Sequence, residues 1–142
     1  MTVEEAKNTI AEMREKLLYG CWFMSGLGPE KVAAACNGCG PASWPEERRE
    51  KLGKWLKTFK LAFDSHDCRF TYDNDGSRER FDYANEELLK NCRLLADLEY
   101  KWFNPVRYFA RNRAHIIFIL CQNFGWSAYQ DAYNKQKQGE TK

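Results

Sequence analysis

The sequence shows little that is extreme: it has no long apolar run and no excess of charge of one sign. Its most apolar segment, His115 to Cys121, is far shorter than the roughly 20 residues that cross a bilayer. The first five residues are acidic and amphipathic, so no signal peptide is visible, and we expect a cytoplasmic protein, or a secreted one if a signal was removed. The net charge of +2, from 22 basic and 20 acidic residues, gives no reason to expect a nucleic-acid partner.

Cysteine is also sparse for a disulfide-stapled miniprotein, with six in 142 residues. Cys36 and Cys39 form a lone C-x-x-C pair, and the sequence offers no second pair of the kind that a tetrahedral zinc site needs. What the chain does have is aromatic residues, 15% of the total and including five Trp, which argue against disorder. The length fits one domain over 1–142.

Hydrophobic spacing predicts an almost wholly helical chain of about five helices, and no alternating strand pattern is present. Thr2 and Glu5 match a capping box that starts the first helix. The expected helical stretches are 3–18, a short 30–36, 44–71, 77–103, 105–124 and a short continuation over 126–133. We therefore expect a hairpin core at about 36–103, a C-terminal helical region over 105–133 and a polar tail over 134–142.

His66, Asp67 and Asp82 are the residues most indicative of chemistry. Turn-forming residues over 73–77 separate the two helices that carry them, and His66 and Asp82 lie at equal distances from Asn74. If the helices return antiparallel, the two side chains face each other. A histidine oriented by a carboxylate is a general base near neutral pH, and Asp67, on another face, is free to hold a metal.

The order of these motifs resembles the phospholipase A2 superfamily, most closely its short bacterial and viral-capsid versions. The residues that carry the resemblance are the glycine loop 37–41, then His66-Asp67, then Ser77-Arg78 and Asp82 on the returning helix. It covers about residues 36–92. The resemblance implies a phospholipase A2-like core and a Ca²⁺-dependent esterase that hydrolyses the sn-2 ester of glycerophospholipids, with a phospholipid or membrane surface as its partner.

The resemblance also implies a role for each residue. His66 would take a proton from the attacking water, and Asp82 would fix the imidazole tautomer. Asp67 would bind Ca²⁺ through its carboxylate. The implied carbonyl ligands to Ca²⁺ are those of Cys36, Gly38 and Gly40, and the Gly38 N–H would support the oxyanion.

The chain departs from the family pattern at several positions. Phe70 stands where a tyrosine would support the metal-binding Asp, and Tyr72 or Tyr83 is the expected substitute. Cys68 lies one position short of the usual cysteine after the H-D pair. The disulfide that joins the loop to the helices is therefore expected to be absent or rearranged, with Cys39 and Cys92 as possible partners.

The turn itself gives an alternative calcium site. An EF-hand-like register would place ligands at Thr71, Asp73, Asp75 and Asp82 with Gly76 in the loop, although Arg78 and Arg80 would repel the ion.

The alternative function is a non-catalytic helical interaction module that keeps the hairpin as a scaffold. Trp44, Trp102 and Trp126 would contribute to a face for a protein partner, since aromatic residues dominate interface anchors. The basic cluster Arg107-Arg111-Arg113 is interpreted as a solvated face, with an anionic lipid layer as its alternative partner. A catalytic site requires His66 to face Asp82, whereas a module does not. The sequence leaves the oligomeric state open.

Overall fold

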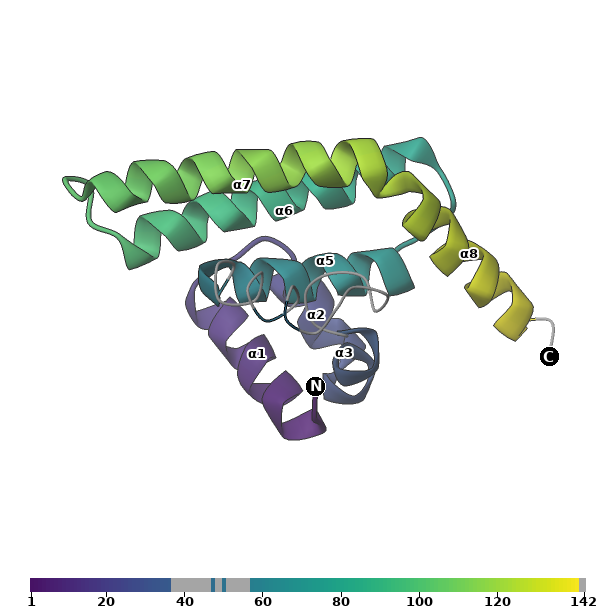
Figure 1. The fold of residues 1–142 in the computed structure, drawn as a ribbon. Coiled ribbons are helices and arrows are strands. Elements are labelled where there is room, and N and C mark those ends of the chain that lie inside the picture. Colours follow the sequence, from purple (N-terminus) through teal and green to yellow (C-terminus); the bar gives the residue numbers. More distant parts are fainter. Residues whose placement is uncertain (37–46, 48–49, 51–56, 141–142) are drawn as a thin grey trace.

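A computed structural model describes residues 1–36, 47, 50 and 57–140, and this part of the chain is all-helical, without a strand (Figure 1). The α-helices are α1 (Val3–Glu15), α2 (Cys21–Leu27), α3 (Pro29–Ala35), α5 (Lys60–Tyr72), α6 (Arg78–Glu99), α7 (Pro105–Phe124) and α8 (Trp126–Glu140); a 3-10 turn, η1, spans Lys57–Phe59. The expected all-α class is confirmed, but the described residues form seven α-helices rather than the expected five or so. None of the described helices combines the length and hydrophobicity that a membrane crossing requires.

The two longest helices, α6 and α7, lie side by side, and α5 packs against the other side of α6 (Figure 1). Helices α1, α2 and α3 form a group that packs on α5, and α8 turns away from the end of α7 to contact α5. One apolar core joins these layers. Its fully buried members include Met13, Val32, Ala62, Cys68 and Leu88.

The first helix starts with the expected capping box. The Glu5 backbone N–H donates to Thr2 Oγ1 at 3.1 Å, and the Thr2 backbone N–H donates to Glu5 Oε2 at 2.6 Å. After α1 the glycines bend the chain between short helices, so 21–27 is helical where no helix was expected. Gly20 and Gly28 take φ values of +82° and +84°, which non-glycine residues rarely adopt.

The turn between α5 and α6 has the predicted chemistry. Asn74 Oδ1 accepts a bond from the Gly76 N–H, and Asp75 Oδ1 accepts one from the Ser77 N–H. Ser77 caps α6, since its hydroxyl accepts a bond from the Arg80 N–H at 3.2 Å. The predicted start of α6 near Ser77 is confirmed.

Helix α7 has the predicted bounds, 105–124. Asn104 caps it by accepting the Val106 N–H, and Pro105 fills the first position, where its missing N–H has no cost. Helix α8, by contrast, continues to Glu140. The expectation of a helix that ends at 133 is therefore wrong, and residues 134–140 are helical rather than a tail.

Three other expected boundaries are also wrong. Helix α1 ends at Glu15 rather than at 18, and Leu17 has a φ of +52°, outside the helical region. The helix over 44–71 is interrupted, because α5 starts at Lys60 after η1, and residues 44–46, 48–49 and 51–56 lie outside the described part. Phe59 is only 1% exposed and its backbone (φ −101°, ψ 9°) is not that of an α-helix, so η1 places this ring in the core. Helix α6 ends at Glu99 rather than Phe103, because Tyr100 is extended.

Candidate functional site

His66 lies in the middle of α5 and is buried against α6. Its Nε2 is 2.8 Å from Asn85 Oδ1, and its ring lies tilted against that of Phe70, one turn later, with 4.2 Å between the ring centroids. The facing residue on α6 is thus Asn85. Asp82, expected to face His66, lies one turn earlier on α6 and is bonded elsewhere.

A chain of hydrogen bonds nevertheless links His66 to Asp82. Asn85 Nδ2 donates to Gln122 Oε1 at 2.9 Å, and Gln122 Nε2 donates to Asp82 Oδ1 at 2.6 Å. The Asp82 carboxylate also accepts a bond from Arg78 Nε at 3.1 Å. Gln122 belongs to α7, so three segments of sequence meet in this relay.

The carboxylate fixes the direction of the relay. An ionised carboxylate only accepts, so the Gln122 amide donates to Asp82 and its oxygen is left to accept from Asn85. Asn85 in turn presents its oxygen to His66. His66 therefore donates from Nε2, and in the neutral ring Nδ1 carries the lone pair.

Burial sets the charge of this histidine. Removal from water lowers the pKa of His66 to about 4, and the hydrogen bond to Asn85 opposes that shift only in part. An amide has no formal charge and stabilises an imidazolium far less than a carboxylate does. At pH 7 the ring is neutral.

The predicted calcium ligands are only partly described. Asp67 is half-buried on α5, and Cys36, at the end of α3, is buried with its Sγ donating to the Asp64 carbonyl at 3.5 Å. Gly38 and Gly40, and with Gly38 the predicted oxyanion support, lie outside the described residues. In the described part no three His, Cys, Asp or Glu side chains gather as a metal site. Asp67 and Cys36 are thus the two predicted ligands in the described part of the chain, and the calcium site stays a prediction.

The two candidate support tyrosines lie at the surface. The Tyr72 hydroxyl donates to the Lys31 carbonyl at 3.2 Å, which ties α5 to α3. Tyr83 is 46% exposed, and the Arg69 guanidinium lies over its ring.

The cysteines in the described residues are free thiols: Cys21, Cys36, Cys68, Cys92 and Cys121. Cys92, named above as a disulfide candidate, is buried, and Cys39 lies outside the described part. A hydrogen bond with Cys68, then burial, raises the pKa of the Cys36 thiol.

The EF-hand-like register is occupied by internal bonds. Asp73 accepts Arg69 at 2.9 Å and Arg80 at 3.3 Å, while Asp75 accepts the Ser77 N–H and hydroxyl. These carboxylates act as turn and helix-end acceptors.

Sequence reasoning missed the buried ion pair beside His66. Glu87, 5% exposed, accepts Arg69 Nε and Nη2 at 3.2 and 2.9 Å and the Ser65 hydroxyl at 3.1 Å. Gly20 approaches so closely that an added Cβ would lie 2.6 Å from Glu87 Oε1. Arg69 and Ser65 lie one turn apart on α5, but nothing local marks Glu87 as their partner.

The three tryptophans proposed for a partner face differ in position. Trp102 is 82% exposed at the tip between α6 and α7, whereas Trp126 packs on Phe81 and Tyr129. Trp44 lies outside the described residues. The tip is therefore the exposed aromatic site among these candidates.

Comparison of the chain with family models, curated proteins and solved structures gives no significant match. The resemblance to the phospholipase A2 superfamily stays a prediction from the motif order.

Proposed function

We propose that the described helices form a non-catalytic interaction module, in which the His66 relay holds α5, α6 and α7 together and an exposed surface binds a partner. The observation that carries the proposal is the surroundings of His66: a buried ring whose partner is the neutral amide of Asn85. This burial lowers the pKa of His66 to about 4.

The chemistry of general bases supports this reading. A base is most effective when its pKa lies near the working pH, and a catalytic histidine is normally held near neutrality by a carboxylate. With a pKa of about 4, His66 has little affinity for the proton of an attacking water. The same burial suits a packing role, since Asn85 is 0% exposed and both of its amide atoms are bonded.

Calcium-dependent hydrolysis of the sn-2 ester of a glycerophospholipid is the second candidate, and the direction of the relay favours it. Because Nε2 donates toward Asp82, Nδ1 is the atom that would accept a proton from water. Asp67 and the Cys36 carbonyl would hold Ca²⁺, which when bound would polarise the ester carbonyl. No step beyond this is assigned.

Fatty-acid release from mixed phospholipid vesicles, with and without Ca²⁺, separates the two candidates. Three proteins are compared: the unsubstituted chain, His66→Ala, and His115→Ala as a control at an exposed histidine. We expect no release that depends on His66. Release that requires both Ca²⁺ and His66, and survives in His115→Ala, would overturn the module and establish the esterase.

The variant Asn85→Asp tests the reason behind the proposal. A carboxylate at this position is expected to raise the pKa of His66 by about 1–3 units, because it stabilises the imidazolium. The readout is an NMR titration of the imidazole resonances, with His115, the other of the two histidines, as internal reference. A His66 pKa that stays near 4 in this variant would contradict the assigned contact.

A further inference from the structure

We infer that the outer face of α7 and the α6–α7 tip bind the headgroup layer of an anionic phospholipid membrane. The inference deepens the proposed interaction role by naming its partner and in that respect rests on it. This surface lies outside residues 36–92, which carry the phospholipase resemblance.

Helix α7 has two apolar faces, and only one is covered. Ala110, Ala114, Ile117 and Cys121 recur at helical spacing, and the first three are buried where α7 packs on α6. A second stripe stays in solvent beside it: Phe109, Ile116 and Leu120 each lie one residue before a member of the first set. This α7 stripe consists of Phe109, Ile116, Ile119, Leu120 and Phe124, which are between 43% and 76% exposed.

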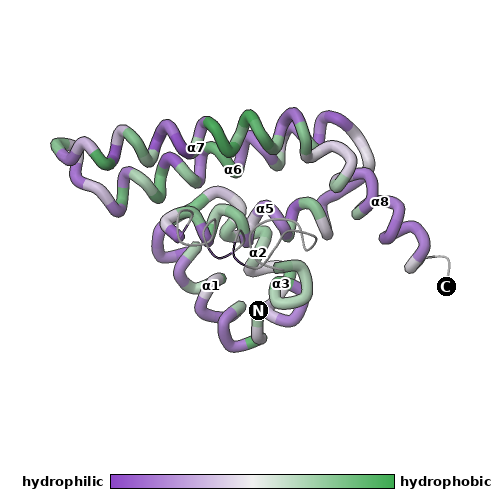
Figure 2. The backbone as a smooth tube through the Cα atoms, in the orientation of Figure 1, coloured by the Kyte–Doolittle hydropathy of each residue, from purple (hydrophilic) through white to green (hydrophobic). Residues whose placement is uncertain are grey.

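The tip continues this apolar character at one end of the helix pair. Trp102, Phe103 and Tyr108 are 82%, 65% and 66% exposed. Figure 2 shows hydrophobic residues both at this end and in the middle of α7. A helix of 20 residues is about 30 Å long. The exposed apolar side chains therefore form an extended surface along α7 and not a single isolated contact.

Charge decides which partner fits. From Tyr100 to Gln130 the sequence contains no Asp or Glu, but it has Lys101, Arg107, Arg111 and Arg113. Arg113 falls within the α7 stripe by helical spacing, four residues after Phe109 and three before Ile116.

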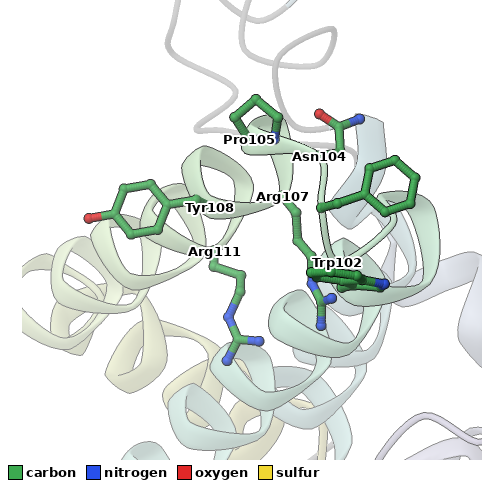
Figure 3. A pocket seen from close by; sticks show the side chains of 7 residues that line it. Trp102, Asn104, Pro105, Arg107, Tyr108 and Arg111 are labelled. Atoms are coloured by element: carbon green, nitrogen blue, oxygen red, sulfur yellow. The ribbon is translucent and has the colours of Figure 1, made fainter.

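At the tip a shallow hollow of about 280 Å³ is lined by Trp102, Tyr108, Arg107 and Arg111 among others (Figure 3). Asp97 accepts bonds from both arginines, at 2.8 and 3.0 Å. With Glu99 at the end of α6 included, the tip has three basic residues (Lys101, Arg107 and Arg111) against two acidic ones, so it keeps a small positive charge.

An anionic lipid layer satisfies both features at once. Aromatic side chains settle at the boundary between headgroups and acyl chains, and basic side chains on the same helix meet the phosphates. A second copy of this chain fits less well, because its own segment from Tyr100 to Gln130 contains no Asp or Glu to meet Lys101, Arg107 and Arg111 of the first copy.

Co-sedimentation with vesicles tests the assignment. Vesicles of phosphatidylcholine alone are compared with vesicles that also contain phosphatidylserine, at low and high salt. We expect binding to the anionic vesicles only, weakened by salt because the attraction is screened.

Trp102→Ala is compared with Trp22→Ala, a matched control because Trp22 is 69% exposed on α2. We expect about tenfold weaker binding for Trp102→Ala, the cost of one partly inserted aromatic side chain, and no change for Trp22→Ala. A second variant, Ile116→Gln with Leu120→Gln, is expected to weaken binding as strongly. Circular dichroism confirms that each variant is folded.

Three results would overturn the inference. Equal loss in Trp22→Ala would place binding elsewhere, and equal binding to neutral vesicles would remove the anionic partner. Absence of vesicle binding, with a dimer in sedimentation that Ile116→Gln with Leu120→Gln dissolves, would assign the face to a second copy. The proposed function is tested separately by the fatty-acid release assay. Failure of the membrane-binding inference and failure of the non-catalytic role can therefore be told apart.

Discussion

The identity of one side chain on α6, Asn85, sets the chemistry of His66. The amide accepts a hydrogen bond from the ring but carries no charge, so desolvation dominates the histidine pKa. Within the relay, the Asp82 carboxylate is the one group that can only accept hydrogen bonds. The two amides of Gln122 and Asn85 separate it from His66. His66 is thereby fixed in tautomer and kept neutral.

Stability is expected to fall in acid because of His66. Its folded pKa, about 4, lies below the unfolded value of about 6.5, so the unfolded chain binds a proton that the folded chain resists. The stabilisation is complete above pH 6.5 and is lost as the pH falls toward 4, with a total of about 3 kcal/mol.

Urea unfolding at pH 7, 5.5 and 4 measures this loss. Burial also raises the pKa of Asp64, and this makes the folded state more stable as the pH falls, opposite to the effect of His66. His66→Gln therefore serves as the reference, because the difference between the two proteins cancels the contributions of all other groups. A variant whose stability falls with pH as steeply as that of the unsubstituted chain would exclude His66 as the cause.

Glu87→Gln is expected to destabilise the fold by about 3 kcal/mol, because it leaves the buried Arg69 guanidinium with an incomplete counter-charge. Arg69 keeps Asp73 at 2.9 Å, which limits the loss. The control is Glu86→Gln, one residue earlier and exposed, for which we expect a change of about 0.5 kcal/mol or less. Similar chemical denaturation midpoints for the two variants would contradict the importance of the buried pair.

At the scale of elements, the turn over 73–77 determines which residues of α5 and α6 meet. Gly76 adopts φ +76°, and α8 is fastened to this turn by Asn74, which donates to the Tyr129 carbonyl, and by Gln130, which donates to the Gly76 carbonyl. The turn therefore sets the register between α5 and α6 and also fixes the position of α8.

Gly76→Ala should lower stability by about 1–2 kcal/mol and loosen α8. An L-residue is strained at this φ, and its Cβ would lie 2.8 Å from the Tyr133 ring. Gly26→Ala is the matched control, because Gly26 lies inside α2 with nothing within 4 Å of an added Cβ. There we expect a gain of up to about 1 kcal/mol. Thermal unfolding compares the two, and equal shifts would exclude a special role for Gly76.

At the scale of the whole molecule, one core connects the N-terminal helices to α6 and α7. Buried thiols are distributed through it, with Cys21 and Cys36 at one end and Cys92 in α6. Burial raises the pKa of Cys121 to about 11, and the pKa of Cys92 is raised as well, again mainly by burial. Thiolate, the reactive form, is scarce in the folded state.

Thiol labelling is therefore expected to require global unfolding. With iodoacetamide in increasing urea, modification of Cys21, Cys68 and Cys92 should follow the loss of helical circular dichroism in one transition. Peptide mass mapping separates these sites from Cys39. Early labelling of Cys92 alone would show that α6 and α7 open independently of the N-terminal helices.

Local patterns predicted much of the fold. The α1 capping box, the turn before Ser77 and the bounds of α7 follow from residues a few positions apart, which interact wherever the helix lies. The same logic missed α2, since glycines in the left-handed region bend a chain without preventing short helices. It also missed the length of α8, whose polar sequence gives no apolar signal.

The partner of His66 shows where local reasoning ends. Which residue of α6 faces His66 depends on where the turn has its centre. When the centre moves along the chain, the facing position on α6 moves twice as far. A small error in the centre is therefore enough to replace Asp82 by Asn85, one turn later. Asn85 lies three residues after Asp82, so helical periodicity could have named it as the next candidate. Gln122 and Glu87 had no local signal.

The sequence by itself determined the all-helical class, the principal caps and the set of polar residues available for a site, because these depend on neighbours in the chain. Only the tertiary structure decided which polar residues meet, how much water they lose and which apolar face of α7 stays uncovered. The physical reason is that packing between helices distant in sequence controls both desolvation and exposure. Desolvation distinguishes a neutral structural histidine from a general base, and exposure distinguishes an open apolar surface from a core.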